Sequence, residues 1–444
     1  MHSLAEFSAL SEGPTVDTNI QFSSVSIDSR SLKPGALFVA IKGDRFDGHD
    51  FIAAAKQQGA VAALVEKPVN VDLPWVQVAC TQQALSHLAQ THRSRFSLPV
   101  IALTGSCGKT TTKEMLRSIL GQCGQVLAPP KSFNTVVGMA LTLLALRLTH
   151  RFVVLEMGAN TPGEIAYLTQ IAQPTVAMIL NVNPAHLAGF GSLSGIAQAK
   201  AEIFQGLGTE GLAIINADDA FSAYWRDQLG NRAYRSFSTQ QTADCFAQEV
   251  TLDATGKPQF TLTSSQGNQT IQLPLLGRHQ VNNALAAATA ALNVGVSLSD
   301  IKAGLETVQA VPGRLTALQG LQGATLLDDS YNANPGSLQV ALAVLSQYPG
   351  QRLLVLGDMA ELGSASADYH RQMGEWAKQQ GIHQLYTCGT LAQFATLGFG
   401  KQAWHFDTQA ALIAALKVQL QPDCTVLIKG SRSAAMEQVV IALQ

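Results

Sequence analysis

The chain has 444 residues, of which 47% are hydrophobic and 14% are charged, and its formal net charge at pH 7 is −2. This length predicts about two to four domains with sizeable apolar cores. The balanced charge excludes a broad electrostatic field for nucleic acid or an anionic membrane, so an anionic substrate must be bound by local basic groups.

Targeting and redox signals predict a cytoplasmic protein. Residues 1–6 lack a basic segment followed by an apolar one, so no signal peptide is expected. The most apolar stretch, residues 139–148, is too short for a membrane span and contains Arg147. The six cysteines are scattered without a C-x-x-C pair, which is typical of reduced thiols and not of disulfides or a zinc site.

The first part of the chain, to about residue 80, has mixed strand and helix signals. Residues 24–27 alternate like a half-buried strand, residues 36–40 form an apolar strand pattern, and residues 51–58 predict a helix that ends at Gly59. Two loops carry polar groups, Asp28–Ser29–Arg30 and Asp47–Gly48–His49. An arginine beside backbone N–H groups could contact a diphosphate, and ordinary turns are the alternative.

A phosphate-binding loop follows a predicted helix at residues 82–95 and a buried strand at Val100–Leu103. Gly105 and Gly108 let the backbone turn its N–H groups toward phosphates, and the helix that begins next adds unpaired donors. Lys109 can reach the terminal phosphates, and the Thr110 hydroxyl can bind Mg²⁺. The predicted contacts are Thr104, Gly105, Ser106, Cys107, Gly108, Lys109, Thr110 and Thr111.

This loop departs from the pattern G-x-x-x-x-G-K-[ST], because Leu103 occupies the first position. A chance Gly-Lys-Thr in an ordinary turn is therefore the alternative interpretation. The preceding strand and the following helix favour the phosphate loop.

Buried strands are also predicted at residues 152–155, 176–180 and 212–216, which suits a parallel sheet covered on both faces. Ligands of such sheets bind at the carboxyl ends of the strands, where the phosphate loop, Glu156 and His186 would meet. Thr110 and Glu156 supply the oxygen ligands that Mg²⁺ prefers. Taken alone, a loop histidine such as His186 is more often structural, and Lys200 would be a solvated helix residue.

The remaining chain predicts an addition to this sheet and then a second sheet. Residues 234–276 predict an antiparallel meander, and an alanine-rich helix extends to Leu292. Past a boundary at 311–313, strands are expected at 324–328, 352–356, 383–387 and 424–428, and the clearest helix at 367–379. The expected α/β fold has three domains: a small mixed domain at 1–81, a central P-loop domain at 82–311 and a Rossmann-like domain at 312–444.

Polar segments follow three strands of the second predicted sheet. They are Asp328–Pro335, Gly357–Gly363 and Lys429–Arg432. Turns alone could explain each one, but polar strand ends that share one sheet edge favour a binding face.

Thr104–Thr111, Glu156, Asn181–His186, Lys200 and Asp328–Pro335 together resemble the Mur ligases over essentially the whole chain. These are ATP-dependent, amide-forming enzymes of peptidoglycan precursor synthesis, and thus of cell-wall biogenesis, cell shape and cell division. The loops at 28–30 and 47–49 are similar to the UDP-binding domain of the third and fourth ligases of that pathway. Residues 329–335 and 357–363 look like the member that adds D-alanyl-D-alanine, and the Asp-Asn-Pro-Arg sequence of the diaminopimelate-adding member is absent.

The resemblance implies a reaction in which a UDP-MurNAc-tripeptide becomes an acyl phosphate and then accepts D-Ala-D-Ala. It implies ATP, two Mg²⁺ ions and a carbamylated Lys200 that holds the second ion with Glu156 and His186. It makes Lys109, Glu156, His186 and Lys200 catalytic, and Thr110, Glu156, His186 and the Lys200 carbamate metal ligands. It also implies small-molecule substrates, no nucleic-acid or membrane partner, and a monomer.

Further contacts carry over by resemblance. Asn282 would contact the nucleotide base, and Arg314 and Asp329 would reach the ATP phosphates and ribose. The UDP-substrate would be contacted by Ser29, Arg30, Asp47, Gly48, His49, Asn134 and Thr135. The dipeptide would be contacted by Tyr331, Asn332, Asn334, Asp358 and Glu361. Because ATP contacts come from two domains, we expect the last domain to close about a hinge at 311–313.

Three alternatives remain at this point. The chain could be another ligase of the superfamily. Such a ligase could add diaminopimelate or lysine, or it could be a folylpolyglutamate synthase. It could be a P-loop switch or motor, or a nonenzymatic nucleotide-sugar binding protein. The third residue of the tripeptide, diaminopimelate or lysine, is left open.

Overall fold

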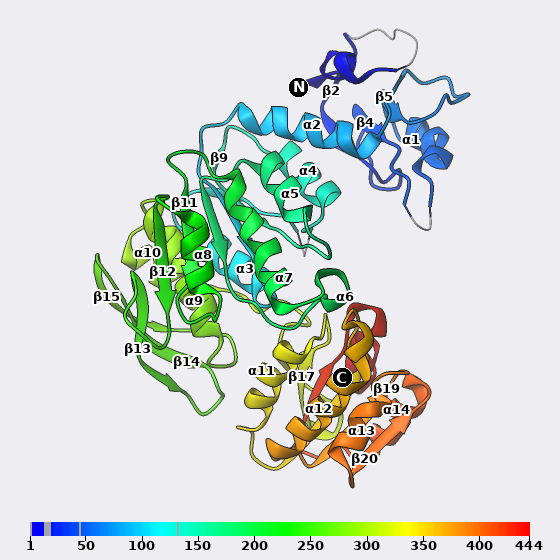
Figure 1. Cartoon of the computed structure of the whole chain (residues 1–444). Helices are drawn as coiled ribbons and strands as arrows, with labels where there is room; N and C mark the ends of the chain where they lie inside the picture. The colour runs from blue at the N-terminus through cyan, green and yellow to red at the C-terminus, as the bar shows by residue number, and fades with distance from the viewer. Residues whose placement is uncertain (1, 13–18, 44–45, 131–132) are drawn as a thin grey trace.

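The computed structural model describes residues 2–12, 19–43, 46–130 and 133–444. Within these residues the chain forms three α/β parts that follow one another in space, with the N-terminal and C-terminal parts at opposite ends (Figure 1). The expected multidomain α/β fold is confirmed. None of the described helices is both long and apolar enough to cross a membrane.

The N-terminal part contains a small parallel sheet. Its strands lie in the order β3 (Ser24–Ser26), β4 (Ala36–Val39), β5 (Ala62–Val65) and β6 (Trp75–Gln77). The short strands β1 (His2–Ser3) and β2 (Gln21–Phe22) pair beside it, and α1 spans Ile52–Gln57. The strands expected at 24–27 and 36–40 and the helix expected at 51–58 are confirmed. One face of this sheet shares an apolar core with α2 (Thr81–Ser94) and α4 (Val136–Leu144).

The central sheet has the order β15-β14-β13-β12-β11-β10-β7-β9-β8. Its strands are β7 (Val100–Thr104), β8 (Gln125–Leu127), β9 (His150–Glu156), β10 (Val176–Ile179), β11 (Leu212–Asn216), β12 (Tyr234–Ser238), β13 (Cys245–Leu252), β14 (Pro258–Ser264) and β15 (Gly267–Gln272). The meander expectation is wrong for β12, which is parallel to both β11 and β13. The chain reaches β12 through helix α8 (Ser222–Leu229), and such a crossover adds a parallel strand.

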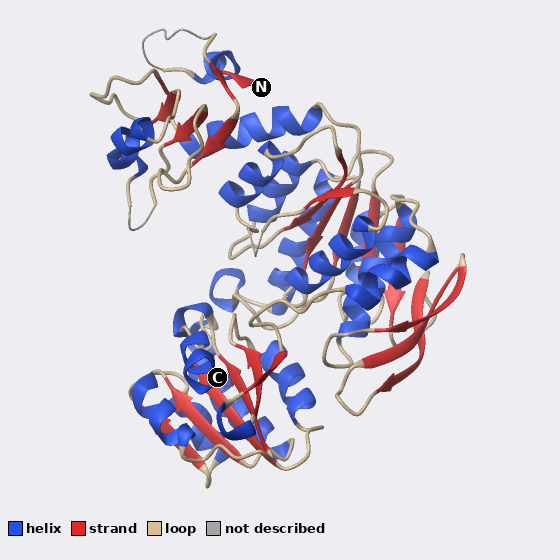
Figure 2. Ribbon diagram, turned by 180° about the vertical axis from the view of Figure 1, so that it is seen from behind, coloured by secondary structure: helices blue, strands red, loops and turns tan. Residues whose placement is uncertain are grey.

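Helices cover both faces of the central sheet (Figure 2). On strand β7, Ile101 and Leu103 pack toward α3 (Lys109–Gly121), α9 (Gln280–Asn293) and α10 (Leu298–Thr307). The alternate residues of β7 share the other core with α2, α4 and α5 (Glu164–Ala172). A strand with both faces buried must be apolar at every position, which explains the uninterrupted run predicted here.

The C-terminal sheet has the order β16-β17-β21-β18-β19-β20. Its strands are β16 (Thr316–Gln319), β17 (Thr325–Asp329), β18 (Gln351–Gly357), β19 (Gln384–Cys388), β20 (Ala403–Phe406) and β21 (Cys424–Lys429). Its helices are α11 (Pro335–Leu345), α12 (Ser366–Gln379), α13 (Gln393–Phe399), α14 (Gln409–Lys417) and α15 (Glu437–Leu443). The expected strands are confirmed, whereas β16 and β20 were not predicted. Both are short edge strands without a buried apolar run.

Candidate active site

The loop between β7 and α3 has the geometry of a phosphate cradle. Gly108 has a left-handed φ of +82°, and a Cβ at this position would collide with Asn283 Oδ1. Asn181 holds the loop from the next strand: its Oδ1 accepts from Cys107 N at 2.9 Å and its Nδ2 donates to Cys107 O at 3.1 Å. The loop is therefore held in shape by side-chain amides, and its backbone N–H groups gather at the start of α3.

Lys109, the first residue of α3, folds its side chain back over this loop. Its Nζ donates to Gly105 O at 2.7 Å. Loss of solvent lowers the pKa of Lys109, and the Glu156 carboxylate acts in the opposite direction. A bound phosphate would offer this ammonium a stronger acceptor than the carbonyl of Gly105.

Glu156, at the carboxyl end of β9, is 2% exposed and lies beside the phosphate loop. Its Oε2 accepts from Thr110 Oγ1 at 2.9 Å, and its Oε1 accepts from Asn134 Nδ2 at 3.2 Å. A carboxylate and a hydroxyl at the start of the helix, next to a phosphate site, fit the way proteins hold Mg²⁺. Among the described residues, no group of three or more His, Cys, Asp or Glu side chains is arranged to hold a metal ion, so Mg²⁺ here would take further ligands from phosphate oxygens and water.

Lys200 and His186 reach the same cavity from α7 (Leu193–Ala201) and from the segment after β10. Lys200 is 5% exposed, and burial lowers its pKa to about 7, with Lys109 acting in the same direction. The interpretation of Lys200 as a solvated surface residue is therefore wrong. His186 has a left-handed backbone, and its Nδ1 forms an ion pair with Glu361 of the C-terminal part.

A cavity of about 820 Å³ separates the phosphate loop from the C-terminal sheet edge. It brings together most of the expected site residues: Ser106, Cys107, Gly108, Lys109, Thr110, Thr111, Asn134, Thr135, Glu156, His186, Lys200, Asn282, Arg314, Asp329, Tyr331, Asn332 and Asn334. Thr104 and Gly105 form the base of the loop. The neighbouring positions of β17, β21 and β18 confirm that the three polar strand ends share one sheet edge.

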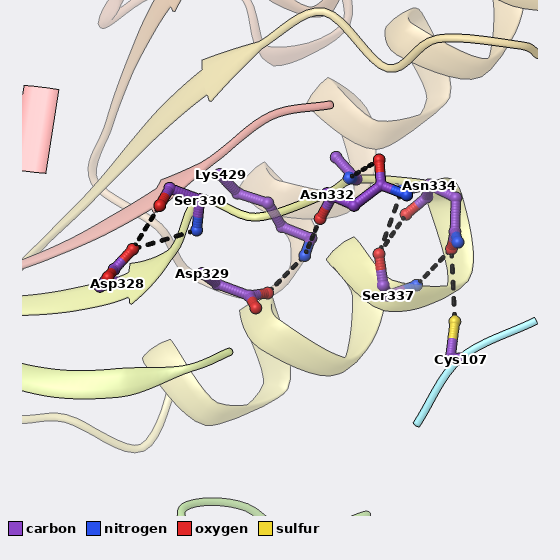
Figure 3. Close-up of polar contacts among 9 residues, drawn as sticks. Cys107, Asp328, Asp329, Ser330, Asn332, Asn334, Ser337 and Lys429 are labelled. Atoms are coloured by element: carbon purple, nitrogen blue, oxygen red, sulfur yellow. Dashed lines mark hydrogen bonds and ion pairs between the residues drawn. The ribbon is translucent and has the colours of Figure 1, made fainter. Parts of the chain in front are cut away.

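The two aspartates at the end of β17 have different roles. Asp328 accepts from Gly313 N at 3.0 Å and from the Ser330 hydroxyl, so its carboxylate fixes the turn. Asp329 lines the cavity and forms an ion pair with the buried Lys429 of β21 (Figure 3). Lys429 Nζ also donates to Asn332 O at 3.0 Å.

Two further contacts cross from the C-terminal part to the phosphate loop. Asn334 caps α11 by accepting from Ser337 N at 2.8 Å, and the same Oδ1 lies 3.6 Å from Cys107 Sγ (Figure 3). Arg314 Nη2 donates to Thr110 Oγ1 at 3.4 Å. Both contacts place C-terminal polar groups where a nucleotide phosphate would bind.

Asp358 and Glu361 do not line the cavity. Asp358 Oδ1 accepts from Leu391 N at 2.9 Å and from Ala392 N at 2.7 Å, so it anchors the turn before α13. Two backbone donors share this one oxygen, and the expected dipeptide contact of Asp358 stays a prediction. Glu361 instead bridges to His186.

The expected UDP contacts of the N-terminal part lie outside this cavity. Arg30 is exposed and bonds to Asp28 through Nε and Nη2, and these contacts lower the pKa of Asp28 to about 2. Asp47 accepts from His49 N and pairs with its ring, while His49 Nε2 accepts from Glu66 N at 2.9 Å. Ser29 is buried beside Arg30, and Gly48 is tightly packed against Ile41. The two loops are thus each held by their own local hydrogen bonds, and their contact with the UDP-substrate stays a prediction.

Some cavity residues were missed by sequence reasoning. Gln280 and Asn283 at the start of α9 bond to each other at 2.9 Å, and Asn283 packs against Gly108. The sequence signal that could have identified them is the cluster of amide side chains at the start of the alanine-rich helix. Next to them, Asn282 Oδ1 is buried and lacks a hydrogen-bond partner among the described residues, as suits a group that binds a ligand.

Comparison with known proteins agrees with this geometry. The model "Mur ligase family, catalytic domain" matches residues 21–101, "Mur ligase middle domain" matches 103–291, and "Mur ligase, glutamate ligase domain" matches 313–432. The UDP-N-acetylmuramoyl-tripeptide–D-alanyl-D-alanine ligase of Escherichia coli K12 is 44% identical, covering 99% of this chain and 98% of its own length.

Solved structures extend the likeness to three dimensions. The crystal structure of MurF from Acinetobacter baumannii has a TM-score of 0.92 and 38% identity, covering 99% of this chain and 97% of that one. MurF ligase from Thermotoga maritima, in complex with ADP, has a TM-score of 0.83 and 30% identity, covering 94% and 96%. The resemblance drawn from the motifs is confirmed, and the chain belongs to the Mur ligase family.

Proposed function

We propose that the protein is an ATP-dependent ligase that joins D-alanyl-D-alanine to UDP-MurNAc-tripeptide, giving UDP-MurNAc-pentapeptide, ADP and phosphate. The observation that carries this proposal is the single cavity in which the phosphate loop faces the polar edge at Asp329–Asn334. The relatives that match nearly the whole chain bear the name of this activity. An enzyme with this product serves peptidoglycan precursor synthesis.

In the first step, an oxygen of the tripeptide's terminal carboxylate attacks the γ-phosphorus of ATP. The bond from that phosphorus to the β–γ bridging oxygen breaks, and ADP leaves. Lys109 and Arg314, which both contact the phosphate loop, stabilise the negative charge of the transferring group. When bound, Mg²⁺ would be held by Thr110 and Glu156 and would neutralise phosphate charge.

In the second step, the neutral amine of D-Ala-D-Ala attacks the acyl carbon. The tetrahedral intermediate then expels phosphate, which takes the proton that the nitrogen loses as the amide forms. A free carboxylate is a poor acyl donor, and the mixed anhydride with phosphate supplies a leaving group. The acyl phosphate must be kept from water. The C-terminal part, which already meets the phosphate loop through Arg314 and Asn334, provides that cover.

The proposal includes two Mg²⁺ ions, of which the second is held by Glu156, His186 and a carbamate on Lys200. Carbon dioxide reacts with the neutral form of an amine. Burial lowers the pKa of Lys200 to about 7, so its neutral amine is accessible near neutral pH. Protein equilibrated with ¹³C-bicarbonate should give a carbamate NMR signal. Lys200→Gln should lack that signal, and a wild-type protein without it would rule out the modification.

The substrate's long axis extends from the cavity toward the N-terminal part. Asn134 and Thr135 in the cavity would contact its muramyl portion. Its UDP portion would be contacted by Ser29, Arg30, Asp47, Gly48 and His49.

The unpaired state of the described cysteines supports a reducing, cytoplasmic compartment. We expect a monomer that binds small molecules and no nucleic acid, to be checked by light scattering.

The deciding experiment measures phosphate release from Mg-ATP and UDP-MurNAc-tripeptide, with and without D-Ala-D-Ala, followed by mass analysis of the product. Dipeptide-dependent release with a UDP-pentapeptide product is expected. Parallel tripeptides that end in diaminopimelate or lysine identify the preferred third residue. If phosphate release needs another amino acid, that amino acid is the acceptor and the family assignment stands. If phosphate release does not depend on any amine, a P-loop switch is favoured.

A further inference from the structure

The dipeptide acceptor carries a carboxylate that takes no part in the reaction. Inside a cavity such a charge needs a cationic partner, because burial of an unpaired carboxylate is costly. Among the described residues, the lysines and arginines that line the cavity are Lys109, Lys200, Arg314, Lys429 and Arg432. None of the expected dipeptide contacts is a cation.

Three of these groups are engaged on the nucleotide side or with a neighbouring carboxylate, and a fourth, Lys200, is the proposed carbamate. Lys109 and Arg314 contact the phosphate loop. Lys200 lies beside Lys109, where a positive charge is disfavoured. Lys429 is buried against Asp329 and the carbonyl of Asn332, which occupy its ammonium (Figure 3).

Arg432 is the remaining cation, and its side chain is 63% exposed. Its Nη1 donates to Glu437 Oε1 at 2.8 Å. Within the described parts of the chain, no acceptor is found for its Nε or Nη2. The guanidinium is therefore held in place through one nitrogen while another edge can accept a carboxylate.

Tyr331 links Arg432 to the reacting region. The Cζ of Arg314 lies 4.1 Å from the centre of the Tyr331 ring, and the Cζ of Arg432 lies 5.8 Å from it. Because Arg314 also contacts Thr110, these contacts connect the phosphate loop to Arg432 through Arg314 and Tyr331. An extended dipeptide spans about 7 Å, so its amine could face the phosphate loop while its carboxylate lies on the Arg432 side of Tyr331.

We propose that Arg432 binds the C-terminal carboxylate of the dipeptide and makes the enzyme selective for acceptors with a free carboxyl end. This inference rests on the proposed function and assigns one more specificity residue to its site. Arg432 stays protonated throughout and takes no part in bond making.

The test compares D-Ala-D-Ala with its C-terminal carboxamide, using wild-type protein and Arg432→Gln. Wild type should prefer the carboxylate by about 10- to 100-fold in kcat/KM, the range for a hydrogen bond to a charged group. Arg432→Gln should lose most of that preference through a higher KM for D-Ala-D-Ala, with the KM for ATP unchanged. Arg432→Lys should retain part of the preference, because its charge remains.

Two controls separate recognition from structure. Arg371→Gln removes an exposed arginine of α12 that pairs with Glu375 away from the cavity, and it should keep the full preference. Glu437→Gln removes the charged partner of Arg432, and this variant should also keep the full preference for the carboxylate acceptor. A wild-type enzyme without the preference, or an Arg432→Gln enzyme with the full preference, would overturn the inference. Absence of any dipeptide-dependent product in wild type would instead count against the proposed function.

Discussion

The central part meets its two neighbours in different ways. Toward the N-terminal part, a single apolar core runs from the small sheet into α2 and α4, and it includes Phe22, Leu37, Leu64, Leu85, Leu88 and Leu143. Toward the C-terminal part, Leu276 alone of the central residues joins the C-terminal core, and three side-chain contacts that cross the junction are polar: Arg314 to Thr110, Cys107 to Asn334, and His186 to Glu361. Separating an apolar core exposes it to water, whereas polar contacts can be exchanged for ligand or solvent.

This difference indicates which junction moves. The connection to the C-terminal part contains Gly313 and Leu315 in left-handed conformations, with Pro312 between helix and sheet. We expect the C-terminal part to change its position when substrates bind and the N-terminal part to stay fixed. Small-angle scattering with and without all ligands tests this, and identical curves would contradict it.

The largest effect is expected at the phosphate loop, on the polar side of this comparison. Lys109→Ala removes the ammonium that would balance the transferring phosphoryl group, and it should lower kcat by about 10³-fold. Binding of the UDP-substrate, measured by calorimetry without ATP, should change little because its expected N-terminal contacts lie outside the cavity. A variant that keeps more than a tenth of wild-type kcat would contradict this role.

On the apolar side, a mutation should affect stability and not chemistry. Leu88→Ala leaves a cavity in the shared core under α2, and it should reduce the free energy of unfolding by about 3 kcal/mol. Leu397→Ala is the matched control, because that leucine is exposed on α13. Urea denaturation measures both variants. Equal midpoints for the two would show that the N-terminal junction is not a packed core.

The C-terminal junction should also respond to pH. Burial lowers the pKa of His279 to about 4, and Lys429 acts in the same direction. Because the folded-state pKa lies below the unfolded value of about 6.5, the unfolded chain binds the proton first. Stability should therefore fall as pH drops from about 6.5 to 4, by about 2 kcal/mol after solvent screening is allowed for.

His279→Gln should flatten this part of the pH profile of the urea midpoint. His87→Gln is the control, since His87 is an exposed residue on α2 and its loss should leave the slope intact. A slope that persists in His279→Gln would assign the pH dependence to other groups.

The same comparison shows what could be predicted from the sequence. Buried strands and the phosphate loop are local patterns, so β7, α3 and the position of Glu156 at the carboxyl end of β9 were predicted correctly. The edge strands β16 and β20 were missed because their half-exposed residues leave no apolar run. The contact between His186 and Glu361 could not be found from either residue's neighbours, since it depends on how two separately folded parts meet.

That last contact carries the smallest expected effect. His186 is a proposed Mg²⁺ ligand, and its Nδ1 is paired with Glu361, whose side chain is 52% exposed. Glu361→Gln removes the charge of this pair, so stability should change by less than about 1 kcal/mol. The freed histidine should give a two- to fivefold lower apparent Kd for Mg²⁺ in the presence of ATP, on the order expected from a weak competing contact.

Pairing with His186 lowers the pKa of Glu361, so the carboxylate is ionised at neutral pH, and its charge in this contact is lost as pH falls through that lowered value. Glu375→Gln is the matched control, because Glu375 pairs with Arg371 within the C-terminal part. In the ligand-free state, Glu361→Gln should also shift the scattering curve toward a more extended arrangement. A weaker Mg²⁺ affinity in Glu361→Gln, with Glu375→Gln unchanged, would mean that Glu361 supports the metal site instead of competing for its histidine.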